Sequence, residues 1–361
     1  MTQGSITVMV TGVGGGGHGD EILKALRLSS LRYEIIGGDM SPLSRGLKVV
    51  DRPYLLPPAS DAGYLRAVLA ACRKHGAKVL FHGSEPELRV MSRERQVILD
   101  AGLLLPINPA RVIDTCMDKV LTQEFLASQG IPVPAFRKVR TVEEAMEFGQ
   151  LPAVLKPSLG GGGSMNVYLV QTRDELAACA AQLLHVAEEF IVQAYVGRPE
   201  DEYTVGVLTD LDGNFVNSIA VRRNLSSALS NRMRVKNRTA RAELGPVLAI
   251  SSGVSQGEIG RFPEVTGPCE RIATALGSRG PINIQCRMVD GVVYVFEINA
   301  RFSGTTSLRA LVGYNEPDVL VRRHLLGESI PTRFPYRSGV IMRSLAETFI
   351  ERIDFPRASE L

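Results

Sequence analysis

The spacing of apolar and polar positions near the C-terminus predicts two adjacent β-strands between Gly280 and Arg301. In both segments polar residues alternate with apolar ones, and successive side chains of a strand point to opposite faces. One face is therefore apolar, whereas the other gathers carboxylate, amide and guanidinium groups. Such groups can hold a hard cation and phosphate oxygens, and an ordinary solvated hairpin face is the alternative. The polar face consists of Asn283, Gln285, Glu297, Asn299 and Arg301.

The turn between these strands decides whether the polar residues share a face. A three-residue loop, Val289-Asp290-Gly291, brings them together and pairs Ile284 with Phe296 on the apolar side. A two-residue turn would break the shared face, because a slip of one residue reverses every side chain. We therefore predict the longer loop, with Gly291 at positive φ after a type I turn.

The first third of the chain alternates short apolar segments with amphipathic ones. This alternation predicts a doubly wound parallel sheet. The expected strands are Ile6–Val10, Tyr33–Ile36 and Lys78–Phe81, and the expected helices are Asp20–Leu28, Asp61–His75 and Glu85–Ala101. A further helix near Asp118–Gln129 is ended by Gly130-Ile-Pro-Val-Pro134.

Beyond this helix the pattern changes to α+β. The expected strands are Ala153–Lys156, Val167–Val170, Phe190–Val196, Glu202–Leu208, Phe215–Val221 and, in the tail, Gly339–Arg343. Helices are expected at Arg173–His185 and Val319–Leu326. The fold class is therefore α/β and α+β, with a Rossmann-like domain followed by two α+β subdomains.

The glycine loop from Gly12 to Gly17 follows a strand, and Asp39 ends the next one. That arrangement matches the dinucleotide-binding pattern, in which a carboxylate binds the ribose. A run of glycines satisfies the pattern easily, so a substrate-facing or merely tight turn is the alternative.

A second phosphate signal lies at Lys156, which ends an apolar strand and is followed by the glycines and serine of 160–164. A glycine loop between antiparallel strands can offer backbone N–H groups to phosphates, and the lysine can supply a point charge. The alternatives are a flexible hairpin loop and a surface lysine.

Composition narrows the function classes. A net charge of +3 is too small to indicate nucleic acid binding. The five cysteines form no CxxC pair, which fits a reducing cytoplasm and excludes a disulfide framework or a cysteine-rich zinc site. We see no secretory leader and no apolar run of the roughly 20 residues that span a bilayer.

Seven cationic residues and no acidic one lie between Arg222 and Arg241. The segment is either a solvated loop or a site for an anionic substrate, to which Arg222 and Arg223 would belong. Nucleic acid is disfavoured because the segment lacks aromatic residues. Glu85 could face a substrate amine or cap the helix that follows.

Together these motifs resemble the ATP-grasp superfamily, in the branch of the carbamoyl-phosphate synthase large subunit and its carboxylate–amine ligase relatives. The hairpin Asn-Ile-Gln…Phe-Glu-Ile-Asn-Ala-Arg is the most specific part. The resemblance implies a Rossmann-like pre-ATP-grasp domain at 1–112, a small ATP-grasp subdomain at 113–188, a large one with the metal site at 189–335, and a tail at 336–361.

The resemblance also implies a role for each matching residue. Lys119 and Lys156 would bind phosphates, and Gly161, Gly162, Gly163 and Ser164 would close over the triphosphate. Adenine would lie at Gln193, Ala194 and Val196, and ribose at Glu202. The magnesium ligands would be Gln285, Glu297 and Asn299, with Arg301 and Lys156 as catalytic residues. The chain departs from the family pattern at Gln193, Ala194 and Ala300, where Glu, Lys and Pro are common.

The implied activity is ATP- and Mg²⁺-dependent joining of a small carboxylate to a small amine through an acyl phosphate, with Mn²⁺ as a substitute metal. The composition favours a cytoplasmic enzyme with no nucleic acid or membrane partner. The oligomeric state is open, with a homodimer as the common arrangement for an enzyme of this size. An NAD(P)-dependent oxidoreductase and a non-catalytic nucleotide-binding protein are the rival hypotheses.

Overall fold

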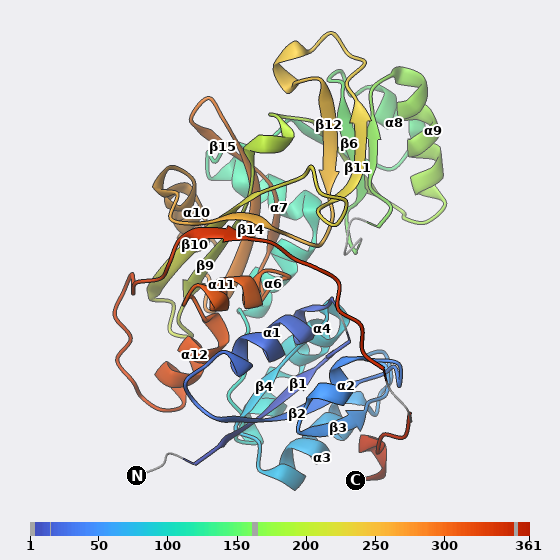
Figure 1. Ribbon diagram of the computed structural model, residues 1–361. Helices are drawn as coiled ribbons and strands as arrows, with labels where there is room; N and C mark the ends of the chain where they lie inside the picture. The colour runs from blue at the N-terminus through green and yellow to red at the C-terminus, as the bar shows by residue number, and fades with distance from the viewer. Residues whose placement is uncertain (1–3, 15, 161–164, 350–352) are drawn as a thin grey trace.

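The computed structural model describes residues 4–14, 16–160, 165–349 and 353–361. The predicted Gly161–Ser164 loop therefore lies outside the described residues. Figure 1 shows the first domain at the bottom, a larger antiparallel sheet in the middle, and a small sheet with a β-ribbon at the top. The division at 112, 188 and 335 remains a prediction.

The first domain is built on a four-stranded parallel sheet of order β3-β2-β1-β4. Its interior strands are apolar on both faces because helices cover them, as in doubly wound folds. The predicted helix 85–101 is divided at Glu94, which ends one helix and precedes the next. The elements are β1 (Ile6–Thr11), α1 (His18–Arg27), β2 (Tyr33–Asp39), α2 (Gly46–Val49), β3 (Arg52–Leu55), α3 (Tyr64–His75), β4 (Val79–Phe81), α4 (Glu85–Arg93) and α5 (Arg95–Asp100).

Two helices lead from this domain to the small antiparallel sheet, whose order is β5-β8-β6-β7. Asp118 caps the second of these helices, since its carboxylate accepts from the N–H groups of Val120 and Leu121. The elements are α6 (Ala110–Met117), α7 (Lys119–Ser128), β5 (Phe136–Val139), α8 (Val142–Met146), β6 (Ala153–Pro157), β7 (Tyr168–Val170), α9 (Arg173–Leu184) and β8 (Phe190–Ala194).

The large sheet has six antiparallel strands in the order β15-β14-β9-β10-β13-β16, and a separate ribbon pairs β11 with β12. The sheet comprises β9 (Glu202–Thr209), β10 (Phe215–Arg223), β13 (Gly257–Gly260), β14 (Pro281–Val289), β15 (Val292–Asn299) and β16 (Gly339–Ile341). The ribbon is β11 (Asn231–Lys236) and β12 (Val247–Ser251), and the helices are α10 (Pro263–Leu276), α11 (Thr306–Leu311) and α12 (Glu316–His324).

The turn of the β14–β15 hairpin corrects the sequence prediction. Val289 pairs with Val292, so the turn has only two residues, and both Asp290 (φ 50°) and Gly291 (φ 77°) are left-handed. This is the backbone of a type I′ turn. The predicted three-residue loop is wrong, although Gly291 does have a positive φ.

The polar residues still share a face because β15 contains a bulge. Gln285 lies opposite Glu297 and Cys286 lies opposite Val295, which leaves Phe296 as an extra residue. One extra residue shifts the register by one position and so cancels the effect of the shorter turn. The expected Ile284–Phe296 pair is replaced by Ile284 with Ile298.

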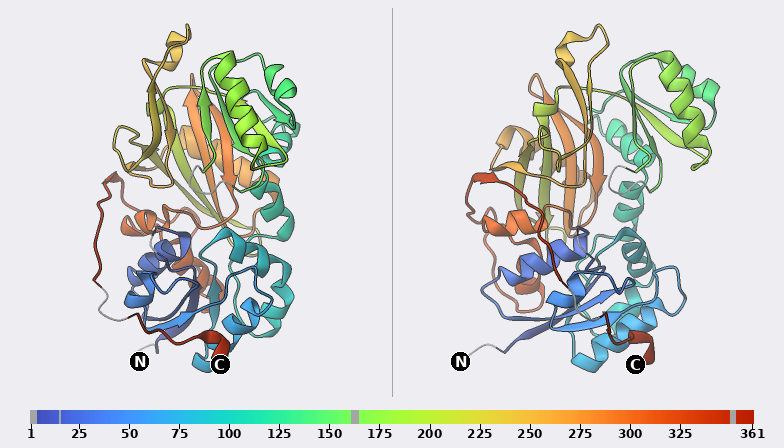
Figure 2. Two further views of the ribbon diagram at one scale, coloured as in Figure 1. Left: turned by 90° about the vertical axis from the view of Figure 1, so that its right-hand side faces the viewer. Right: turned by 45° about the vertical axis from the view of Figure 1, so that its right-hand side comes forward.

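Both views in Figure 2 show the large sheet beside the small sheet and above the first domain. Pairs of buried residues from both sides, such as Phe81 of the first domain and Phe302 after β15, pack in one apolar cluster. This cluster holds the large sheet against the first domain.

Candidate nucleotide and metal site

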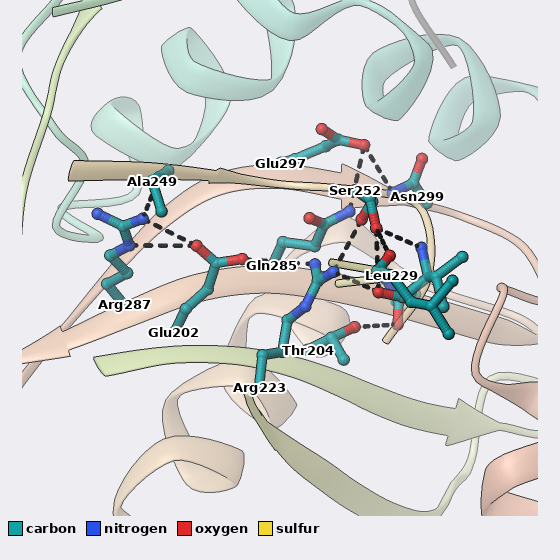
Figure 3. A network of polar contacts seen from close by, with 12 residues as sticks. Glu202, Thr204, Arg223, Leu229, Ala249, Ser252, Gln285, Arg287, Glu297 and Asn299 are labelled. Atoms are coloured by element: carbon teal, nitrogen blue, oxygen red, sulfur yellow. Dashed lines mark hydrogen bonds and ion pairs between the residues drawn. The ribbon is translucent and has the colours of Figure 1, made fainter. Parts of the chain in front are cut away.

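Glu297 is the centre of the polar face. Its Oε1 accepts from Asn299 Nδ2 at 3.0 Å and from Gln285 Nε2 at 3.4 Å (Figure 3). The other two predicted metal ligands therefore both contact the carboxylate of Glu297. The bulge produces this arrangement, since without the extra residue Glu297 would lie on the opposite face of its strand.

Lys156 of β6 reaches the same place from the small sheet. Its Nζ donates to the carbonyl of Phe296 at 2.8 Å, and the side chain is 5% exposed. A bulged residue is left out of the strand ladder, which makes its carbonyl free to accept from a side chain. Burial lowers the pKa of Lys156 to about 8; the charge of Glu297 opposes this shift and that of Lys119 adds to it.

A cavity of about 130 Å³ opens between the two sheets. Its lining combines apolar side chains with charged and amide groups, a composition suited to a base and its phosphates. Nearly all described residues that the sequence assigned to the nucleotide line it: Lys119, Lys156, Gln193, Ala194, Val196 and Glu202, together with Gln285 and Glu297.

The predicted hinge at the adenine position already uses several of its polar groups. The Ala194 N–H donates to Ala135 O at 2.8 Å, and the Val196 carbonyl accepts from Arg287 at 2.9 Å. The side chain of Gln193 donates to Gln123 at 3.0 Å. Adenine contact would therefore depend on the remaining backbone groups and on apolar packing.

Glu202, the predicted ribose ligand, is 2% exposed and is held by two arginines (Figure 3). Arg287 NH2 lies 3.0 Å from its Oε2, and Arg223 NH1 lies 3.4 Å from its Oε1. The sequence analysis missed Arg287, although it alternates with Gln285 on the same face of β14. Its position two residues after Gln285 was a usable signal.

The cationic run from Arg222 to Arg241 is not a single loop. Arg222 is exposed and donates to the Glu200 carbonyl, whereas Arg223 is buried and donates to the carbonyls of Ser252 and Val254. The two side chains point to opposite faces of β10. Arg222, Arg223 and Arg234 nevertheless line one cavity of about 490 Å³, and Arg223 also approaches the candidate site. The assignment of Arg222 and Arg223 to an anionic substrate stays a prediction.

A second cavity, of about 180 Å³, adjoins the first on the side of the first domain. Arg301 and Asn299 line it, and Lys119, Gln285 and Glu297 line both cavities. Among its described lining residues, the apolar side chains are those of Cys116 and Met117, and most others are hydroxyl, amide or charged. The predicted metal ligands thus lie where the two cavities meet.

Glu85 also reaches this cavity from the N-terminus of α4. Its Oε1 forms an ion pair with Arg301 NH2 at 2.7 Å, and the same guanidinium nitrogen donates to Asn299 Oδ1 at 3.0 Å. Burial would raise the pKa of Glu85, but the charge and hydrogen bond of Arg301 outweigh it, so the pKa is lowered. Glu85 is thus both in the first turn of a helix and at the site.

Asp39 is not free to bind a ribose. Its Oδ2 accepts from the N–H of Gly14 at 2.6 Å and its Oδ1 from the N–H of Ser41 at 2.9 Å, and the residue is buried. The carboxylate therefore stabilises the glycine loop itself, which gives Asp39 a structural role that does not depend on a dinucleotide.

Comparison with known proteins agrees with this geometry. Residues 187–348 match the family model described as ATP-grasp in the biosynthetic pathway with Ter operon, and residues 10–105 match the PylC-like N-terminal domain. The chain is 26% identical over 309 residues to the carbamoyl phosphate synthase large chain of Pyrococcus furiosus, which covers 82% of this chain and 27% of that protein. It is 29% identical over 217 residues to the uncharacterized protein y4rH of Sinorhizobium fredii, which covers 55% and 39% respectively.

Solved structures share the whole architecture. N5-carboxyaminoimidazole synthetase from Staphylococcus aureus, solved with ADP, superposes with a TM-score of 0.64 at 15% identity, covering 93% of this chain and 82% of that one. An L-amino acid ligase from Bacillus licheniformis gives 0.60 at 18% identity, covering 90% and 75%.

Residues 187–348 therefore match an ATP-grasp family model, and the first domain matches a PylC-like N-terminal domain. The chain is similar in sequence to carbamoyl phosphate synthase large chains and shares its fold with an L-amino acid ligase. It spans 27% to 39% of the length of the first curated relatives it matches. Among the described residues, no helix has the length and apolar character needed to cross a membrane.

Proposed function

We propose that this chain is an ATP- and Mg²⁺-dependent ligase that joins a carboxylate to an amine through an acyl phosphate. The observation that carries the proposal is the shared lining of the two cavities by Lys119, Gln285 and Glu297. ATP in the first cavity would present its γ-phosphate at the junction, where an acceptor in the second cavity meets it.

The mixed lining of the nucleotide cavity supports ATP binding. Val154, Ile250 and Phe296 supply apolar surface for a base, and Lys119 and Lys156 supply cations for phosphates. Lys119 Nζ donates to the Gly160 carbonyl at 2.7 Å, so this lysine is held at the start of the glycine loop.

The residues at the junction fit Mg²⁺. Glu297 offers carboxylate oxygens, and the amides of Gln285 and Asn299 can turn their oxygens toward the same point, because amide oxygen and nitrogen occupy equivalent positions. Oxygen donors of this kind suit Mg²⁺, and Mn²⁺ accepts them too. When bound, the metal would neutralise charge on the β- and γ-phosphates.

The reaction needs positioning and charge more than a nucleophilic side chain. An acceptor carboxylate oxygen attacks the γ-phosphorus, the bond to the β-phosphate oxygen breaks, and ADP leaves. The amine nitrogen then attacks the acyl carbon, phosphate leaves, and the amine loses a proton. Arg301, held between Asn299 and Glu85, lies where it would stabilise charge on the transferred phosphoryl group.

The second cavity favours small hydrophilic acceptors, because an apolar substituent would be buried against hydroxyl and charged groups. The acid and the amine themselves are not identified by its lining.

We further infer a cytoplasmic homodimer. A dimer is named for one structural neighbour, the biotin carboxylase domain of the 2-oxoglutarate carboxylase from Hydrogenobacter thermophilus, which superposes with a TM-score of 0.60 at 16% identity, covering 92% of this chain and 71% of that one.

A phosphate-release screen tests the proposal. Carboxylates are paired with amines in the presence of ATP and Mg²⁺, and coupled products are sought by mass spectrometry. Phosphate release that requires both the carboxylate and the amine, and that yields an amide product, supports ligation. ATP binding without release for any pair would favour a non-catalytic protein, and thermal stabilisation by NAD(P) but not by ATP would favour the oxidoreductase.

A further inference from the structure

The C-terminal tail crosses from the large sheet to the first domain. Figure 1 shows residues 342–349 as a red coil that leaves the red arrow of β16 and runs toward the first domain. The side chains of Met342 and of residues 344–349 are exposed, whereas Arg343 between them points inward and is 19% exposed. An inward arginine in an otherwise solvated segment calls for a specific set of partners.

Arg343 connects three segments that are far apart in the sequence. Its guanidinium donates to Glu21 of α1 through NH1 (3.0 Å to Oε1) and NH2 (2.9 Å to Oε2). Nε donates to the Ser255 carbonyl at 3.2 Å, and NH2 also donates to the Gly304 carbonyl. Its backbone N–H donates to Gln256 Oε1 at 3.0 Å.

The partners of Arg343 either form part of the wall of the second cavity or lie directly behind it. Ser255 and Gly304 line that cavity themselves, and Glu21 follows the lining residue His18 by one turn of α1. Arg343 is not among the described lining residues. Its contacts therefore hold the wall from the outside, with one side chain joining the first domain, the 252–256 loop and the 303–305 loop.

The Glu21–Arg343 pair is strong because it is bidentate and buried on one side. Glu21 is 1% exposed, and Ser307 Oγ donates to its Oε2 as well. Burial would raise the pKa of Glu21, but the hydrogen bond and charge of Arg343 outweigh it and lower the pKa. Removing the guanidinium would leave a buried carboxylate with less compensation, so the wall would rearrange.

We propose that Arg343 is a positioning residue for the acceptor, which it serves by fixing the wall of the second cavity without touching the substrate. This inference rests on the proposed function of that cavity. Its consequence is selective: loss of Arg343 impairs acceptor use, while nucleotide binding in the first cavity, whose lining residues Arg343 does not contact directly, is retained.

The test compares Arg343→Met with Arg322→Met. Arg322 is a matched control because it is 20% exposed, pairs with Asp318, and also reaches the first domain through Ser30, yet it lines neither cavity. We expect the acceptor KM of Arg343→Met to rise roughly 10- to 100-fold while the KM for ATP changes less than about twofold. Arg322→Met is expected to leave both values unchanged.

Arg343→Lys is the conservative variant. A single ammonium can keep the ion pair to Glu21 but cannot reach the carbonyls of Ser255 and Gly304 in the same geometry. We expect an acceptor KM between those of the wild type and Arg343→Met. Equal acceptor KM values in all three proteins, or an equal rise in the KM for ATP, would overturn the proposal.

Hydrogen exchange separates this proposal from the function itself. In Arg343→Met, amides of 252–256 and 303–305 should exchange faster than in the wild type, and those of α10 should not change. If the wild type shows no acceptor-dependent phosphate release, the proposed function fails, and the exchange data still report whether Arg343 holds the wall. Unchanged exchange in both loops would contradict the positioning role whatever the activity.

Discussion

At the scale of single residues, the site depends on one carboxylate among two amides. Glu297 accepts from both Gln285 and Asn299, and these are the predicted metal ligands. Since amides are neutral, Glu297 supplies the formal negative charge of this set. Its loss should therefore affect metal binding more than any other single change in the triad.

Glu297→Gln is expected to lower ATP turnover by at least about 100-fold, because the amide keeps the shape but removes the charge that a divalent cation needs. Phosphate release at saturating Mg²⁺ measures the effect, and circular dichroism checks the fold. Glu258→Gln, on β13 of the same sheet and outside both cavities, is the control. Turnover close to that of the wild type in Glu297→Gln would refute the assignment.

We expect ATP affinity to depend on pH if Lys156 binds the phosphates as proposed. Burial lowers its pKa to about 8 in the free protein, and bound phosphates would favour the ammonium and raise that pKa. ATP affinity should thus be highest below pH 8 and fall as pH rises through 8, by up to about tenfold per unit, until the pKa of the complex is passed. Calorimetric titration between pH 7 and 9.5 measures this.

Adenosine provides the control for this titration, since it lacks the phosphates that Lys156 would contact. Its affinity should not vary over the same range. An ATP affinity that stays constant from pH 7 to 9.5 would show that Lys156 does not carry the charge that binds phosphate.

At the scale of elements, the hairpin shows what the sequence could and could not predict. Period-two alternation correctly placed both strands and their polar residues, because burial of one face dictates it. The turn was mispredicted although Asp290-Gly291 favours a two-residue turn. Such a turn keeps the polar residues of both strands on one face only if β15 also contains a bulge at Phe296. A single sequence gives no clear signal for a bulge, because a bulge results from how two strands pair with each other.

Gly291→Ala tests the turn. At φ 77° a residue with a Cβ is strained whatever space surrounds it. The variant should therefore lose about 1 kcal/mol of stability, and its denaturation midpoint should be lower than that of the wild type. The KM for ATP should not change, because the turn lies at the far end of the hairpin from Asn299. Gly149→Ala, at an open position without a positive φ, should not be destabilised. Equal stability of the two variants would contradict the type I′ turn.

At the scale of the whole molecule, the sequence predicted the domains' character but not the contacts between them. Glu85 and Arg301 were each noted, yet their ion pair joins residues 216 positions apart. Glu21 and Arg343, which the sequence analysis did not name, form a second ion pair between segments far apart in the sequence. Partners of this kind follow from how sheets are stacked, and local patterns carry no information about stacking.

The last residues of the chain give a test of that long-range assembly. The N–H of Leu55 in β3 donates to the Pro356 carbonyl at 2.8 Å, Arg357 bridges to Leu55, and Ala358 is 1% exposed beside α3. Deleting 356–361 removes a backbone partner of β3 and uncovers α3. Amide exchange of 52–55 and 64–75 should then quicken roughly tenfold. ATP affinity should persist, because residues between Lys119 and Glu297 line the nucleotide cavity.

Arg357→Ala is the control for the deletion, because it keeps the backbone contacts and should leave amide exchange unchanged. If Arg357→Ala and the deletion speeded exchange equally, the tail would stabilise the first domain through the Arg357 side chain and not through its backbone.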